Sequence, residues 1–176
     1  MPDGNPVTLM TVRVALMCYA IVLTLLLAGC RGARWRLVLR SAWTIGCLAF
    51  VAHVAAAFHY THHWNHADAI RSTAQQTKAL MGWAFGEGLY FSYIFLLLWI
   101  ADAAFWWLRP DRYESRPNWM NYAIHGYLFF IAFNGAIVFE SGVTRPAGIV
   151  AVAVFAFFAY RRRNMLLSGS QRNDES

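Results

Sequence analysis

The chain has 176 residues, of which 59% are hydrophobic, 16% are aromatic and only 14% are charged. This composition excludes an ordinary soluble domain and is typical of an integral membrane protein. The formal net charge is +6, but the basic residues cluster beside the ends of apolar runs, which excludes a nucleic-acid-binding domain with one basic face.

The first predicted membrane span covers residues 7–29 and is followed by Cys30 in the string LAGC, the pattern of a lipoprotein processing site. Processing there would remove the first helix. However, Arg34 and Arg36 follow closely, whereas a translocated segment lacks such positive charge. No Lys or Arg precedes Arg13 on the amino-terminal side. We therefore predict a retained helix with its amino terminus outside.

Four further apolar runs are predicted to cross the bilayer, because a transmembrane helix needs about 20 apolar residues. They cover residues 37–60, 83–108, 119–140 and 145–160. The last run is short for a span, and three arginines stop it. The polar residues 164–176 are predicted to form a disordered cytoplasmic tail. The sequence thus predicts one all-α domain over residues 1–163, a polytopic bundle of five transmembrane helices.

The basic residues predict which side of the membrane each loop faces. With the amino terminus outside, the loops at 29–36 and 109–118 and the chain from 161 are cytoplasmic. Most basic residues lie in or beside these segments, as the positive-inside rule requires: Arg31, Arg34, Arg36, Arg40, Arg109, Arg112, Arg116, Arg161, Arg162, Arg163 and Arg172. The outer segments hold Arg71, Lys78 and Arg145. We expect a cytoplasmic C-terminus and a protein integral to the bacterial inner (cytoplasmic) membrane.

A histidine cluster follows the second predicted span, in the string HYTHHWNHADA at residues 59–69. If that helix continues past the membrane surface, the histidines fall at i, i+3, i+4 and i+7 on one face. Imidazoles one turn apart can bind the same cation, and two glutamates are expected at the same membrane level. The pattern predicts a site for one divalent transition metal, Zn, Cu or Fe. Its predicted ligands are His59, His62, His63, His66, Glu87 and Glu140.

Proton sensing or relay is one alternative role for these histidines. A further interpretation is that a stretch rich in His, Trp and Tyr is also typical of a membrane interface. It would then belong to a non-enzymatic membrane subunit or scaffold and dock a membrane or extracytoplasmic protein partner. The string His59-x-x-His62-His63 resembles one histidine box of the membrane fatty-acid desaturases and hydroxylases, whose di-iron centres use several boxes. This chain has no second box, so that activity is not inferred.

The sequence identifies no catalytic residue and no nucleotide-binding motif. A haem is not predicted either, because His53 and His125 are expected at different depths in the bilayer.

Two ionisable residues are predicted inside the bilayer at matched depth. Asp102 lies about two turns from the inner end of its span, and His125 lies about two turns from the inner end of the next. Ionisable groups in a membrane are usually paired or functional. We therefore predict an intramembrane polar pair of Asp102 and His125. Arg13, in the outer part of the first span, can reach Glu87 or Glu140 and so competes with a metal for these carboxylates.

Overall fold

The computed structural model describes residues 5–30, 32–138 and 144–174, and every regular element in these ranges is a helix. The elements are α1 (Pro6–Leu27), α2 (Ala33–Tyr60), α3 (His66–Met81), α4 (Gly88–Leu108), α5 (Pro110–Glu114), α6 (Asn118–Phe133), the π-helix η1 (Asn134–Val138) and α7 (Thr144–Asp174). Three of them, α1, α2 and α4, are long and apolar enough to cross a membrane. The predicted all-α fold is confirmed, and these helices fit a membrane protein.

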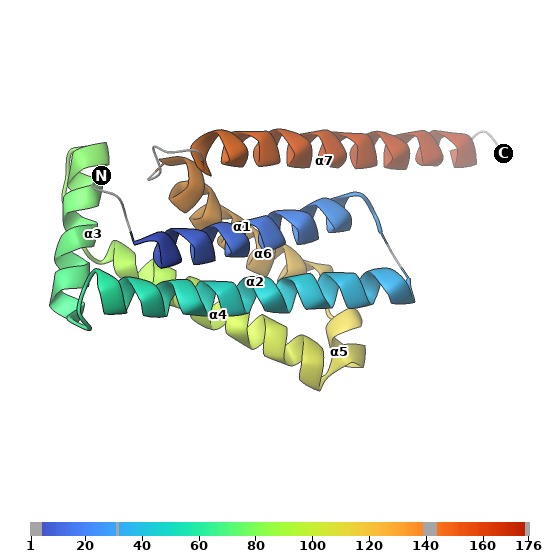
Figure 1. Ribbon diagram of the computed structural model, residues 1–176. Helices are drawn as coiled ribbons and strands as arrows, with labels where there is room; N and C mark the ends of the chain where they lie inside the picture. Colours follow the sequence, from blue (N-terminus) through green and yellow to red (C-terminus); the bar gives the residue numbers. More distant parts are fainter. Residues whose placement is uncertain (1–4, 31, 139–143, 175–176) are drawn as a thin grey trace.

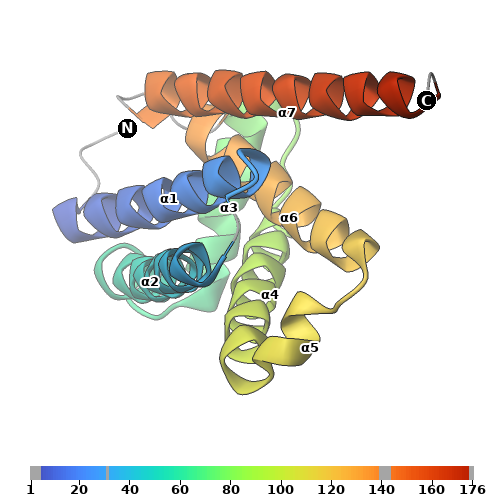
Figure 2. The same ribbon diagram turned by 90° about the vertical axis from the view of Figure 1, so that its right-hand side faces the viewer.

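The long helices run in alternating directions between two ends of the molecule (Figure 1). At one end, called here the α3 end, α3 lies across the bundle where α2 finishes and α4 begins. At the opposite end, called the α5 end, the short helix α5 joins α4 to α6, as Figure 2 also shows. Helices α1 and α2 pack side by side, and α7 lies along another side of α1.

The helices near the C-terminus differ in length from the predicted ones. α6 has 16 residues, fewer than a span needs, and the backbone continues as the π-helix η1 to Val138. α7 runs to Asp174, past the predicted end at 160 and through most of the predicted tail at 164–176. Arg, Met and Leu in this segment are good helix formers, and no proline interrupts them. Five membrane crossings and their orientation remain predictions.

An aromatic core joins the helices that carry the sites described below. Trp43 of α2 and Trp99 of α4 are each 1% exposed, and their ring centroids lie 5.0 Å apart. Tyr19 of α1 lies 5.9 Å from each ring. Gly46 makes room for this packing, because a Cβ there would lie 2.9 Å from both the Trp99 ring and the Cys18 Cβ. Such close contact suits membrane helices, whose association depends on van der Waals packing.

Candidate functional site

The histidine cluster extends from the end of one helix, across a turn, to the start of the next. α2 ends at Tyr60, and α3 begins at His66. Between them His63 and Trp64 have φ values of 47° and 61°, in the left-handed region. That conformation costs about 1–2 kcal/mol per residue when the residue is not glycine. The prediction that His59 to His66 continue α2 as one helical stripe is therefore wrong.

The capping of α3 explains why a new helix starts there. The Asn65 side chain accepts a hydrogen bond of 3.2 Å from the Asp68 N–H, which makes Asn65 the N-cap. Asp68 lies in the first turn, where the helix dipole favours a negative charge. At the other end Gly82 adopts a φ of 82° as a left-handed C-cap. α3 thus has its own start and stop signals.

Two of the predicted metal ligands make contacts within the protein instead. His62 donates from Nδ1 to the Asp68 carboxylate at 3.0 Å, which closes the turn. His66 forms a 3.1 Å hydrogen bond with the Tyr93 hydroxyl, which connects α3 to α4. His59 and His63 are exposed. His66 is exposed as well, apart from its bond to Tyr93, so two of the four histidines form links within the protein and three lie at the surface.

The Asp68 carboxylate is the charged group of this turn. Its pKa lies below the ordinary value of 3.8, chiefly because it accepts the hydrogen bond from His62. The charges of His62, Arg71 and His63 lower the pKa further, and Arg71 Nη2 lies 3.9 Å from Asp68 Oδ1. The folded turn therefore favours the ionised form of Asp68.

Within the described residues, no three His, Cys, Asp or Glu side chains are grouped so that they could hold a metal ion. Glu87 is exposed at the start of α4. Glu140 lies outside the described residues, and so does its predicted contact with Arg13. The alignment of ligands on which the metal prediction depended is lost because α2 ends at Tyr60.

α3 is held on the bundle by small side chains. Ala69 and Thr77 are buried, and Thr77 Oγ1 accepts a hydrogen bond of 2.8 Å from the N–H of Phe85, in the segment that precedes α4. A Cβ at Gly86 would lie 2.7 Å from Ile70 Cγ2 and 2.8 Å from the Ile70 carbonyl. The absence of a side chain at Gly86 therefore lets α3 approach closely, which fixes the histidine turn on the bundle.

The α5 end holds a buried ion pair. The Asp102 and Arg116 side chains are 1% and 3% exposed, and Arg116 Nη1 donates to Asp102 Oδ1. The Tyr113 hydroxyl donates to Asp102 Oδ2 at 3.0 Å. Arg116 Nε donates to Asn121 Oδ1 at 2.6 Å. Arg116 can reach α4 because the chain folds back through α5.

This network takes the place of the predicted hydrogen-bonded pair of Asp102 and His125. Both carboxylate oxygens of Asp102 are bonded to Arg116 and Tyr113. His125 lies near enough to interact electrostatically with Asp102, but among the described residues its buried Nδ1 has no hydrogen-bond partner. Its ring packs against Trp43 at a centroid distance of 5.2 Å. The sequence did not reveal Arg116 as the partner, because that arginine lies in a loop whose positive charges also indicate topology.

Tyr113 encloses the ion pair from α5. Its ring stacks on Trp106 with centroids 4.4 Å apart, and the Arg116 guanidinium lies 3.8 Å from its centroid. Burial and the neighbouring Asp102 raise the pKa of Tyr113, so its hydroxyl remains a donor. The arrangement holds α4, α5 and α6 together and is structural in character.

The α3 end is the better candidate for function, because its pair of Asp68 and His62 is partly exposed beside a strained turn, whereas the pair of Asp102 and Arg116 at the α5 end is buried. Comparison with family models, with curated proteins and with solved structures finds no match to this chain. Its function is therefore inferred from geometry.

Proposed function

We propose that the protein is a non-enzymatic integral membrane subunit that docks a protein partner through the turn between α2 and α3. The proposal rests on backbone strain at an exposed aromatic residue. Trp64 has a φ of 61° and is 66% exposed. A bulky residue in the left-handed region persists only where its surroundings hold it, and such strain often marks functional positions.

Several contacts hold Trp64 in this conformation. Its N–H donates to the Phe58 carbonyl at 2.9 Å, and the two rings lie 6.0 Å apart. The next residue, Asn65, is fixed as the N-cap of α3. The bond from His62 to Asp68 closes the same turn. A rigid exposed indole loses little conformational entropy on binding, and tryptophan is enriched at binding hot spots.

The exposed neighbours of Trp64 indicate what a partner must offer. His59, in the last turn of α2, and His63, in the turn itself, are both exposed. They suit a surface with an apolar pocket for the indole and hydrogen-bonding or acidic groups around it. Anchoring in the lipid interface would also use an indole, but it does not require a strained backbone. Binding of a transition metal is the alternative that the experiment must separate.

Photo-crosslinking tests the proposal. A photoreactive amino acid replaces Trp64, and the variant is expressed in the cells that naturally produce the protein. A variant with the same amino acid at position 119 is the matched control. Trp119 is 67% exposed in α6 near the α5 end. We expect position 64, and not position 119, to crosslink to one discrete protein. The same protein should copurify with the wild type in a fixed ratio and be lost from Trp64→Ala.

Two other outcomes would contradict partner docking. Crosslinks from position 64 to lipid alone would indicate an interfacial anchor. Stoichiometric Zn, Cu or Fe in the purified wild type, lost in the double variant His59→Ala and His63→Ala, would favour the metal site instead. Elemental analysis of both proteins distinguishes that case.

A further inference from the structure

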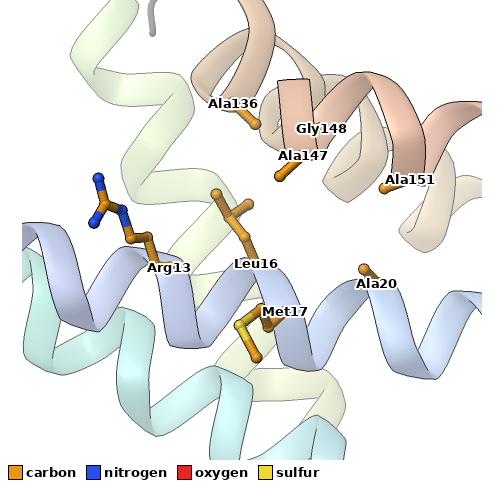
Figure 3. A pocket seen from close by; sticks show the side chains of 8 residues that line it. All are labelled: Arg13, Leu16, Met17, Ala20, Ala136, Ala147, Gly148 and Ala151. Atoms are coloured by element: carbon orange, nitrogen blue, oxygen red, sulfur yellow. The ribbon is translucent and has the colours of Figure 1, made fainter. Parts of the chain in front are cut away.

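A groove runs along α1, between this helix and α7 (Figure 3). It consists of two cavities, of about 270 Å³ and about 340 Å³. Both are lined by Ala20, Ala147 and Ala151, so the cavities form one continuous groove. Its lining on α1 extends from Arg13 to Leu25, which is about 18 Å of helix from the rise per residue.

The groove exists because small side chains line it on both helices, Ala20 on α1 and Ala147 and Ala151 on α7. Small residues between membrane helices normally let two backbones approach closely. Here Gly148 of α7 is used for a different contact, because a Cβ at this position would lie 2.9 Å from Ile137 Cγ1 on η1. α7 is therefore seated on η1, and the alanines that face α1 line an open groove.

The groove is apolar inside and open at its side. The bulkier lining residues between its ends are Leu16, Met17, Ile21, Leu25, Val150, Val154 and Phe155. The Thr24 hydroxyl already donates to the Ala20 carbonyl at 2.7 Å. Such walls give water or a polar ligand no partners. Met17 is 63% exposed, and α1 is apolar enough to span a membrane, so the side opening faces hydrocarbon.

We infer that the groove binds one acyl chain of an anionic phospholipid, with the lipid phosphate at Arg13. The groove gives an extended acyl chain a continuous apolar surface along α1, from Leu16 to Leu25. Arg13 lies at its end nearer the α3 end, and its side chain extends away from Ala20 (Figure 3). Arginine side chains in membranes reach towards the headgroups in this way.

Arg13 supplies the charge that complements a phosphate. A guanidinium has five N–H donors in a fork that matches phosphate oxygens. Arg13 also makes an interaction within the protein, and the number of donors allows it to bind a phosphate at the same time. The acyl chain then occupies the apolar part of the groove from Leu16 inwards.

Native mass spectrometry tests this inference on the full chain. The protein is extracted from phosphatidylcholine vesicles that contain a minor share of phosphatidylglycerol. The wild type should retain phosphatidylglycerol above its share in the vesicles. Ala151→Leu fills the groove and should lower lipid retention several-fold, whereas Ala153→Leu, on an exposed part of α7, should not. A wild type without retained lipid, or full retention in Ala151→Leu, would overturn the inference.

Further variants separate the headgroup from the chain. Arg13→Gln should still retain lipid but lose the preference for phosphatidylglycerol, while Arg71→Gln, an exposed arginine of α3, should keep it. An unchanged preference in Arg13→Gln would overturn the phosphate assignment. If Ala151→Leu does not fold, Ala20→Leu fills the groove from the opposite wall. A wild-type dimer that Ala151→Leu converts to a monomer would show that a second copy fills the groove instead.

Discussion

The two ends of the bundle use similar residues in opposite ways. At the α5 end Asp102 and Arg116 are 1% and 3% exposed. At the α3 end Asp68 and His62 are 46% and 15% exposed. A buried ion pair makes each partner indispensable, because an unpaired charge in a dry interior is strongly destabilising. An exposed pair contributes little to stability. The pair at the α5 end therefore contributes to the stability of the fold, whereas the pair at the α3 end belongs to a surface that faces the surroundings.

Removing one partner of the buried pair should have the largest effect. Asp102→Ala leaves Arg116 as an unpaired charge, so we expect the free energy of unfolding to fall by about 3–5 kcal/mol. Denaturant unfolding of the detergent-solubilised protein measures it. The double variant Asp102→Leu and Arg116→Met should be more stable than Asp102→Ala, because it removes both charges. If Asp102→Ala is as stable as the wild type, the ion pair does not hold the α5 end together.

A substitution in the aromatic core tests how closely the helices pack. Gly46→Ala places a Cβ 2.9 Å from the Trp99 ring and from the Cys18 Cβ. We expect it to lower the free energy of unfolding by about 1–3 kcal/mol through overpacking. Gly126→Ala is the matched control, since nothing lies within 4 Å of a Cβ there, and it should leave stability unchanged or raise it. Equal effects at both positions would show that the core has room.

The sequence predicted the helices better than their connections. Apolar runs mark where α1, α2 and α4 lie, because each consists mainly of residues suited to hydrocarbon. The start of α3 was missed because the histidine spacing also fits a continuous helix. A signal for it was present in Asn65 followed three residues later by Asp68, an N-cap residue and an acidic first turn. The capping of α3 by Asn65 determined where the helix begins, and the histidine spacing did not.

The buried network around Asp102 shows a different limit of prediction from the sequence. Asp102 and His125 were expected at matched depth, and the structure does place them near each other. The hydrogen-bonding partner, Arg116, comes from a loop that folds back through α5. Depth along a helix can be counted from the sequence, but the direction in which a loop returns depends on tertiary packing. Loop arginines that serve as topology signals can therefore also be buried partners.

A substitution that relieves strain in the turn should have a smaller effect than Asp102→Ala and Gly46→Ala, and it should raise the free energy of unfolding instead of lowering it. His63 has a φ of 47°, so His63→Gly removes a steric penalty of about 1–2 kcal/mol while adding backbone entropy to the unfolded chain. We expect the free energy of unfolding to rise by about 1 kcal/mol or less. Gln75→Gly, at an exposed helical position of α3, should lower it by about 1 kcal/mol. Thermal unfolding of both variants measures the difference, and a loss of stability in His63→Gly would count against backbone strain.

The smallest effect should come from the exposed Asp68 carboxylate, and it should depend on pH. The folded-state pKa of Asp68 is lowered from 3.8, first because of the hydrogen bond from His62. A lowered folded pKa stabilises the turn at pH values above the unfolded pKa, and that stabilisation disappears as the pH falls through the folded value. Protection of the backbone amides of Asp68 and Ala69, which bond to Asn65, should therefore decrease below pH 3.8, after correction for intrinsic exchange. Asp68→Asn should lack this step and resemble the acidified wild type at neutral pH. The same acid step in Asp68→Asn would assign the titration to another group and remove Asp68 from the account of how the turn is held.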